Sequence, residues 1–303
     1  MKITKLFVII LIFFSSCKEE LPDPIAFSRT NADENIFVAP DGQSYYTGVG
    51  DCEGGPSYSV SDNVVESLEI PDVLPESYDL SEFLPPVRSQ GSQGSCVSWA
   101  VGYYMKSMQE KIQNGYEYGP ETIMSPAYTY NQIAAGDCRG TSIETTLLIL
   151  KEKGICSLSS FPYNQNSCAL QPTSIQDEVA ANAKISDFKS LSGENMVLEM
   201  KALLLEKTSV IISAALDNQF GVEDEFGLTA YREHEVDYEN AGCHAMLVVG
   251  YSDEFNAFKV VNSWGPDWGD DGFVWIDYKA FDNVLDEDAS FRVINTAHIA
   301  IDE

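Results

Sequence analysis

One cysteine lies where a flexible turn meets an apolar stretch of the chain. The turn runs from Gln90 to Ser95 and is rich in glycine and serine, and Cys96 begins the apolar stretch. We expect Ser95 to be the N-cap of a helix and Cys96 to lie in its first turn, where unpaired N–H groups and the helix dipole favour a thiolate. Gln90 could donate a side-chain N–H to an oxygen that becomes negative beside the sulfur. These residue types suit a cysteine nucleophile, and a buried structural thiol is the alternative that the rest of the sequence must decide.

A thiolate nucleophile needs a base to hold its proton and a third group to orient that base. His244 opens an apolar run that is typical of a buried strand, where a lone histidine is more often a satisfied core residue. Asn262 at the end of the next expected strand favours the catalytic interpretation. The hairpin-length connection lets the Asn262 carbonyl accept one ring N–H of His244, which leaves the other ring nitrogen for Cys96. Trp264 can cover that hydrogen bond and keep water out.

Four blocks of the sequence resemble, in the same order, the motifs of papain-family cysteine peptidases. They are Leu74-Pro75-Glu76-Ser77-Tyr78-Asp79, then Gln90-Gly91-Ser92 with Gly94-Ser95-Cys96, then His244-Ala245 with Val249-Gly250-Tyr251, and lastly Asn262-Ser263-Trp264-Gly265-Pro266 with Trp268-Gly269 and Gly272-Phe273. The resemblance implies that Cys96 is the nucleophile and His244 the general base and acid. It also implies that Asn262 orients His244 and that Gln90 stabilises the oxyanion. A pre-formed thiolate–imidazolium pair is expected, because each charge stabilises the other.

The resemblance also extends to the substrate cleft, with departures. The segment Cys138-Arg139-Gly140-Thr141 resembles the family segment whose backbone binds extended substrate. We therefore expect Gly140, Thr141 and Trp264 to support the cleft, although Thr141 replaces a family glycine and alters the main specificity pocket. Gln93 stands where the family usually has a cysteine, so that family disulfide is absent.

The chain has seven cysteines. Beside Cys96, the family resemblance implies a disulfide between Cys138 and Cys168. Cys243 is expected to be a buried small hydrophobic residue rather than a second nucleophile. No pairing is assigned to Cys52, Cys156 or Cys243.

Hydrophobic periodicity predicts the elements that position these residues. After Cys96 the apolar residues recur at helical spacing as far as Asn114-Gly115, and further helices are expected over 125–135, 142–153 and 196–207. Short runs rich in β-branched and aromatic residues indicate strands at 210–212, 245–251, 258–262 and 273–278. The expected fold is α+β and papain-like, with a helical lobe, an antiparallel barrel-like β lobe and the active-site cleft between them.

The first residues resemble an export signal. Lys2 and Lys5 precede an unbroken apolar run that is too short to span a membrane. Small residues then lead directly to Cys17, as in bacterial lipoproteins, where the cysteine is lipidated and becomes the mature N-terminus. The expected location is therefore the bacterial cell envelope, lipid-anchored in the outer membrane or at the cell surface. An ordinary cleaved secretory signal is the alternative.

The resulting domain organisation has three parts. Residues 1–16 are the signal peptide, residues 17–73 an acidic tether or a short pro-segment, and residues 74–303 the peptidase domain. The middle part contains no long amphipathic helix, and this absence favours the tether over an inhibitory pro-segment.

Composition excludes several function classes. The formal charge is −29, which argues against nucleic acid as a partner because phosphate binding needs clustered lysine and arginine. No histidine pair has metal-ligand spacing and no Cys-x-x-Cys occurs, so we expect no metal and no cofactor. We expect a monomer that hydrolyses peptide or protein substrates. Two alternatives stay open: a catalytically weak binding lipoprotein with the same fold, and a thiol transferase or amidase that acts on cell-wall peptide.

Overall fold

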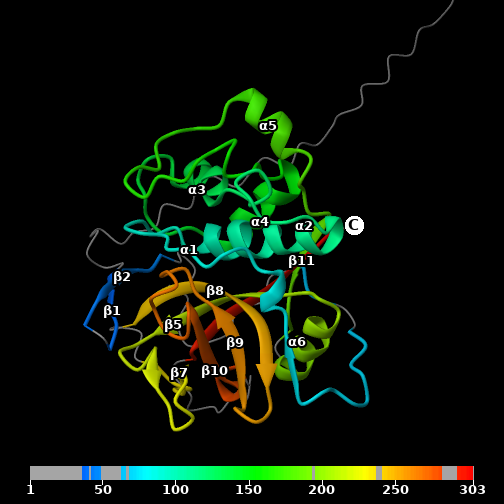
Figure 1. Ribbon diagram of the computed structural model, residues 1–303, viewed down its shortest axis with the longest axis vertical. Helices are drawn as coiled ribbons and strands as arrows, with labels where there is room; N and C mark the ends of the chain where they lie inside the picture. Colours follow the sequence, from blue (N-terminus) through cyan, green and yellow to red (C-terminus); the bar gives the residue numbers. More distant parts are fainter. Residues whose placement is uncertain are drawn as a thin grey trace, which may run out of the picture.

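The computed structural model describes residues 36–40, 42–48, 63–65, 68–192, 195–236, 241–281 and 292–302. The expected signal peptide, Cys17 and Cys52 lie outside these ranges. Figure 1 shows a helical lobe above a β lobe, as the sequence predicted. Within the described ranges, no helix combines the length and the apolar composition that a membrane crossing requires.

The helical lobe is organised around the helix that begins at Cys96. This helix continues through three segments: α1 (Cys96–Ser98), the π-helical η4 (Trp99–Lys106) and α2 (Ser107–Asn114). Every residue of η4 is buried, which explains why its sequence is apolar on nearly all faces. The helix ends at Gly115, whose φ of 68° is a left-handed conformation that glycine adopts without strain. The other helices of this lobe are α3 (Pro126–Ala134), α4 (Ile143–Glu152) and α5 (Ser174–Ala180).

The β lobe is one large sheet whose central strand carries His244. Along the sheet the strand order is β4-β11-β5-β8-β9-β10-β7-β6, and β3 also pairs with β8. The strands are β3 (Ser77–Asp79), β4 (Asp187–Ser190), β5 (Val210–Leu216), β6 (Val222–Glu223), β7 (Thr229–Tyr231), β8 (Gly242–Ser252), β9 (Ala257–Val261), β10 (Phe273–Asp277) and β11 (Ile294–Ile301). The pairing is antiparallel as predicted, except that β10 and β7 run parallel. No hairpin joins these two strands, so their direction is not constrained by a tight turn.

The two lobes meet where the Cys96 helix packs against the sheet. Both α1 and η4 contact β8, and one hydrophobic core continues through both lobes. Helix α6 (Met196–Leu205) packs against β3, β5 and β8, and Figure 1 shows it to the right of the strands. Short 3₁₀ turns, η3 (Ser81–Phe83) and η5 (Tyr278–Ala280), complete the described elements. This packing places the N-terminus of the Cys96 helix beside the start of β8.

A small hairpin precedes the two lobes in the sequence. Its strands β1 (Ile36–Val38) and β2 (Ser44–Tyr46) pair antiparallel, and Figure 1 shows them beside the β lobe. Phe37 is 5% exposed and belongs to the main core. Residues 36–48, which we call the covering segment, therefore pack against the body of the protein.

Candidate active site

The end of β8 holds the nucleophile in place. The Ala245 N–H donates to Cys96 Sγ at 3.5 Å, so the sulfur lies against the residue that follows His244. Ser95 occupies the N-cap position, as predicted, but its side chain makes no capping hydrogen bond. Its hydroxyl bonds instead to the Tyr163 hydroxyl at 2.7 Å, because Phe161-Pro162-Tyr163 packs behind this turn. The first-turn N–H groups of the helix are therefore not occupied by the Ser95 side chain.

His244 is oriented by Asn262 from the neighbouring chain segment. Asn262 directly follows β9, and its Oδ1 lies 2.7 Å from His244 Nε2. The Ser263 N–H donates to the same oxygen at 2.7 Å, which sets the orientation of the amide. His244 Nε2 must therefore carry a proton, and Nδ1 is the ring nitrogen that can accept one. Nδ1 is buried and has no hydrogen-bond partner among the described residues.

Trp264 covers the His244–Asn262 hydrogen bond. Its ring centroid lies 4.8 Å from that of His244, and the Trp264 side chain is itself only 5% exposed. Trp268 and Phe220 pack edge-on against Trp264. This aromatic cluster keeps water away from the hydrogen bond, which strengthens it.

Gln90 presents one amide hydrogen to the site. Its Oε1 accepts from the Ser263 hydroxyl, and its Nε2 donates to the Gln93 carbonyl at 2.8 Å. An amide nitrogen carries two hydrogens, so one remains for an oxyanion. The Gln90 backbone N–H also donates to the Ser263 carbonyl at 2.8 Å, which ties this turn to the Asn262 segment. Ser263, which the sequence showed only as part of a motif, is thus the residue that holds Gln90 in position.

The covering segment crosses the same site. Tyr45 and Phe37 stack on Trp264 with ring centroids 4.6 Å and 5.3 Å away. Trp264 Nε1 donates to the Tyr46 carbonyl at 3.1 Å. Gly48 bridges the two walls of the cleft: its N–H donates to the Cys243 carbonyl at 3.0 Å, and its carbonyl accepts from the Thr141 N–H at 3.1 Å. The aromatic residues in an otherwise polar stretch were a signal of this role that the sequence analysis did not use.

This cover buries the catalytic pair. Cys96 and His244 both have no exposed surface. Burial raises the pKa of the Cys96 thiol to about 12, although the N–H groups of Ala245, Val97 and Gly48 partly oppose this shift. Burial also lowers the pKa of His244 to about 4, against the opposing effect of Asn262. Burial in the covered state therefore opposes the predicted thiolate–imidazolium pair, because the exclusion of water disfavours both charged forms.

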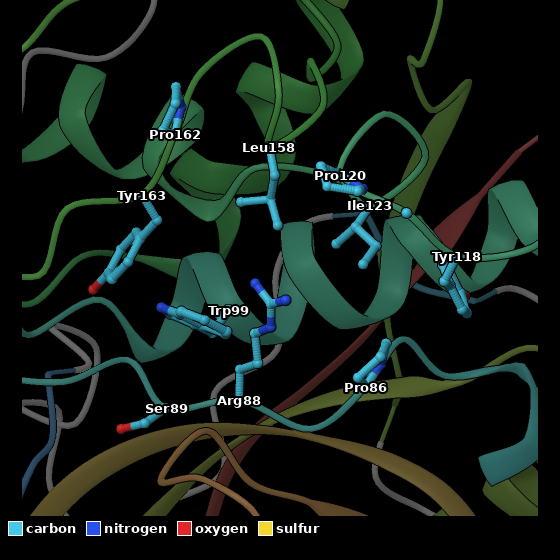
Figure 2. Close-up of a pocket in the computed structure, with 11 residues that line it drawn as sticks. Pro86, Arg88, Ser89, Trp99, Tyr118, Pro120, Ile123, Leu158, Pro162 and Tyr163 are labelled. Carbon is cyan, nitrogen blue, oxygen red and sulfur yellow. The ribbon is translucent and has the colours of Figure 1, made fainter.

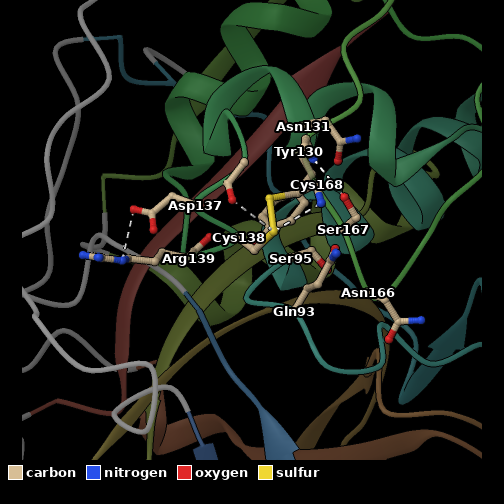
Figure 3. The surroundings of a disulfide bond; sticks show 12 residues. Gln93, Ser95, Tyr130, Asn131, Asp137, Cys138, Arg139, Asn166, Ser167 and Cys168 are labelled. Carbon is tan, nitrogen blue, oxygen red and sulfur yellow. Dashed lines mark hydrogen bonds and ion pairs between the residues drawn. A yellow bond between two sulfur atoms is a disulfide. The ribbon is translucent and has the colours of Figure 1, made fainter.

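The substrate-binding wall is braced by a disulfide. Cys138 and Cys168 are bonded, and Figure 3 shows this bond between the two loops that flank Ser95 and Gln93. The Cys138 carbonyl accepts from the Gly94 N–H at 3.4 Å, which links this wall to the nucleophile turn. Gly140 and Thr141, which follow Arg139, contact Gly48 of the covering segment; their role in substrate binding stays a prediction.

Two further cysteines differ in their bonding. Cys156 is a free, buried thiol. Cys243, whose pairing the sequence left unassigned, is disulfide-bonded and only partly buried, so the expectation of a buried small hydrophobic residue is wrong. Its side chain points away from His244 because neighbouring residues of a strand alternate in direction.

A cavity of about 510 Å³ lies beside the Gln90 turn. In Figure 2 the Arg88 side chain points into this cavity, next to Trp99 and beneath Leu158. Tyr163 lines the cavity and its hydroxyl donates to the Gln90 carbonyl at 2.7 Å. None of the four predicted catalytic residues lines this cavity, and no sequence pattern indicated it.

Together, the fold and the site define a cysteine peptidase with a Cys, His and Asn arrangement. Residues 74–291 match the family described as papain family cysteine protease. The chain belongs to this family.

Individual proteins show the same similarity. The chain is 28% identical over 213 residues to a cathepsin B-like protein, CP2, from Giardia intestinalis, covering 67% of this chain and 68% of that protein. It is 29% identical over 206 residues to cathepsin J of Rattus norvegicus, covering 64% of this chain but only 57% of that protein. Among solved structures, the cysteine protease xylellain from Xylella fastidiosa superposes with a TM-score of 0.66 at 21% identity, over 82% of this chain and 96% of that chain. This last likeness shows the papain fold.

Proposed function

We propose that this chain hydrolyses peptide bonds through a thioester on Cys96, and that residues 36–48 hold the peptidase in an inactive, covered form. The observation that carries the first part is the arrangement of His244 between Asn262 and the segment that contacts Cys96 Sγ. The observation that carries the second part is the complete burial of Cys96 and His244.

The reaction follows from the positions of the polar groups. His244 Nδ1 takes the Cys96 proton, and the thiolate attacks the substrate carbonyl carbon. The remaining Gln90 Nε2 hydrogen and the Cys96 N–H stabilise the oxyanion. His244 then protonates the leaving amine, and a water molecule deprotonated by His244 hydrolyses the thioester. Asn262 holds the imidazole in the tautomer that each of these steps requires.

The covering segment passes directly beside the nucleophile. The Gly48 N–H donates to the Cys243 carbonyl at 3.0 Å and also acts to lower the pKa of Cys96. Cys96 and His244 have no exposed surface, so the covered site excludes both a substrate and the water that hydrolysis needs. Residues 36–48 must therefore leave the cleft before a substrate can bind.

The test of activity is covalent labelling with an epoxysuccinyl probe after the covering segment has been removed. Labelling is expected on Cys96 and should be lost in Cys96→Ala, whereas Cys156→Ala, which removes the free buried thiol, should label normally. A folded protein that does not label, or that labels equally in Cys96→Ala, would refute the proposed nucleophile.

The substrate class needs a separate experiment. A peptide library and purified cell-wall peptide should be incubated with the protein from which the covering segment has been removed. The products should then be identified by mass spectrometry. We expect hydrolysis of the peptide library, abolished in His244→Ala. Transfer products or cleavage of cell-wall peptide alone would favour the transferase or amidase alternative.

We also propose that the protein is exported and anchored by a lipid on Cys17. The support is the basic start, the short apolar run and the small residues before Cys17 in the sequence. Mass analysis of the mature N-terminus from membranes should show a diacylated cysteine that is absent in Cys17→Ala. An unmodified N-terminus in the soluble fraction would favour the ordinary secretory signal.

A further inference from the structure

We propose that the cavity beside the Gln90 turn binds the C-terminal residue of a peptide substrate, with Arg88 holding its carboxylate and the apolar walls holding its side chain. This inference rests on the proposed peptidase function and names a substrate class for it. The class is peptides in which the cleaved bond lies two or three residues before a free C-terminus. The catalytic residues themselves do not require such a terminus.

The first observation is that Arg88 is a cation without a carboxylate partner. Its side chain is exposed at the surface and points into the cavity in Figure 2. The guanidinium makes no ion pair or hydrogen bond with any described residue, although its charge partly opposes the burial-raised pKa of the Tyr103 hydroxyl. The chain has 47 acidic residues and only 18 lysines and arginines, so an arginine left without a carboxylate is unexpected. Because a guanidinium can hold a carboxylate through two parallel hydrogen bonds, Arg88 is available to a carboxylate from outside the chain.

The second observation is the composition of the cavity walls. Trp99, Ile123 and Leu158 supply apolar surface around Arg88, and of the described residues that line the cavity none is acidic. The cavity volume of about 510 Å³ lies within the range of about 300–1,000 Å³ that is typical of small-ligand sites. Apolar walls favour an apolar side chain, and they strengthen an ion pair beside them because the local dielectric constant is low. A carboxylate that is attached to an apolar group therefore fits this cavity better than a carboxylate alone.

A second hydrogen-bond donor lines the same cavity. Trp99 is 2% exposed, and its Nε1 has no hydrogen-bond partner among the described residues. This N–H lies close enough to the Tyr163 hydroxyl to oppose in part its burial-raised pKa, but not in hydrogen-bond geometry. A buried N–H without an acceptor costs free energy, and an oxygen atom of a bound ligand would give it one.

The third observation places the cavity on the leaving-group side of the cleft. His244 must protonate the leaving amine, so the leaving part of a substrate passes His244 and the Trp264 ring that covers it. Ser89 lines the cavity and forms an antiparallel backbone bridge with Trp264. Arg88 precedes the oxyanion donor Gln90 by two residues, so their Cα atoms are at most about 7 Å apart. An extended peptide advances about 3.3 Å per residue, so the second or third residue after the cleaved bond reaches Arg88.

The covering segment leaves this cavity free. None of its described residues lines the cavity, although Tyr45 and Phe37 stack on Trp264. Binding to the cavity can therefore be measured on the full-length protein with its cover in place, where no activity is needed.

The first experiment measures this binding by ligand-observed NMR on the full-length, covered protein. The probe is N-acetylphenylalanine, which joins a carboxylate to an apolar ring, and its neutral counterpart is N-acetylphenylalanine amide. We expect the acid to bind about 10-fold more tightly than the amide, because hydrogen bonds to a charged group are the stronger ones. Arg88→Gln should remove this difference, and the exposure of Arg88 makes a folding defect in the variant unexpected.

The matched control is Lys184→Gln, which removes the same charge from an exposed residue that does not line the cavity. This variant should bind the acid as the wild type does. Equal binding of the acid and the amide, no binding of the acid, or unchanged binding of the acid by Arg88→Gln would each overturn the carboxylate site.

The second experiment measures whether a substrate uses the site. Peptides of one sequence, with either a free C-terminal carboxylate or a C-terminal amide, are incubated with the protein from which the covering segment has been removed. We expect cleavage two or three residues before the free C-terminus, with kcat/KM about 10-fold higher than for the amide, mainly through a lower KM. Arg88→Gln should lower kcat/KM for the acid to the level of the amide, Arg88→Lys should restore part of the preference, and Lys184→Gln should keep all of it. Cleavage that ignores the distance to the C-terminus, or equal kcat/KM for both forms, contradicts the assignment of the cavity to the substrate.

These readouts separate the inference from the proposed function. Arg88-dependent binding of N-acetylphenylalanine by a protein that hydrolyses no peptide would refute the peptidase activity and leave the carboxylate site in place. Hydrolysis of the acid and amide peptides at equal rates would leave the peptidase activity in place and refute the role of Arg88.

Discussion

Gly48 packs so closely against Gly94 that a β-carbon on Gly48 would lie 2.5 Å from the Gly94 Cα atom. A β-carbon on Gly140 would likewise lie 2.7 Å from the Gly48 carbonyl carbon. Three glycines therefore bring the covering segment, the nucleophile turn and the substrate-binding wall into backbone contact. Only a chain without a side chain at position 48 can follow this path, so the cover depends on Gly48.

Replacing Gly48 should open the site. Gly48→Val puts side-chain atoms where the Gly94 backbone lies, and such overpacking costs about 1–3 kcal/mol. We expect the Cys96 labelling rate of the uncut protein to rise about 10–100-fold, measured with the epoxysuccinyl probe. Gly42→Asn is the matched control, because nothing lies within 4 Å of a β-carbon there and asparagine tolerates the positive φ. Equal labelling of the wild type and Gly48→Val would show that Gly48 does not limit access.

Removing the Gln90 amide should lower the rate of the chemical step. Gln90→Ala deletes one of the two oxyanion donors, and we expect kcat to fall by about 10²–10³-fold in the uncovered peptidase. Gln93→Ala makes the same chemical change in the same turn, but the Gln93 side chain donates to the Asn164 carbonyl at 2.9 Å rather than facing the oxyanion. Steady-state kinetics of both variants should show the large loss only for Gln90→Ala. Similar losses in both would indicate that the turn, and not the donor, is responsible.

The covered protein should lose stability in acid because of His244. Burial lowers the pKa of His244 to about 4, below the ordinary value of 6.5, so the unfolded chain binds the proton more tightly. The contribution of this shift to the free energy of unfolding is fully present above about pH 6.5 and is lost as the pH falls toward 4. Between about pH 7.5 and pH 5 the loss in the free energy of unfolding is about 2 kcal/mol.

The comparison of wild type with His244→Gln isolates this effect. Denaturant unfolding at the two pH values should show the wild type losing about 2 kcal/mol more than the variant. The same loss in both proteins would contradict the assigned shift. Cys96 affects stability at alkaline pH instead. Burial raises its pKa to about 12, so its contribution to the free energy of unfolding is present below about pH 9 and is lost as the pH rises toward 12.

The disulfide between Cys138 and Cys168 should stabilise the substrate-binding wall. The bonded residues are 30 positions apart, and closing a loop of this size is worth about 2–4 kcal/mol. The Cys138→Ser, Cys168→Ser variant should unfold at a lower denaturant concentration and have a raised KM, since Gly140 and Thr141 lie only two and three residues after Cys138. Cys156→Ala is the control, because it removes a thiol without breaking a disulfide. An unchanged KM would show that the wall does not need this brace.

The identities of the catalytic residues could be predicted because they depend on local patterns. A turn before an apolar helix singles out Cys96, and two neighbouring strands place Asn262 near His244. The end of the central helix at Gly115 was also predictable, since a glycine after a periodic stretch is a local signal. The absence of helical periodicity favoured a tether for residues 17–73, whereas the covering segment contains a short hairpin that carries aromatic residues.

The sequence by itself determined the fold class, the family and the order of the catalytic residues, because these follow from residue types and their spacing. Only the tertiary structure decided the state of the site. The contact between Cys96 and Ala245 joins residues 149 positions apart, and the contacts of Gly48 join it to both lobes. Protonation depends on burial, and burial depends on every segment that surrounds a group. For this reason the complete burial of the catalytic pair, the cover over it and the bonded state of Cys243 emerged only from the folded chain.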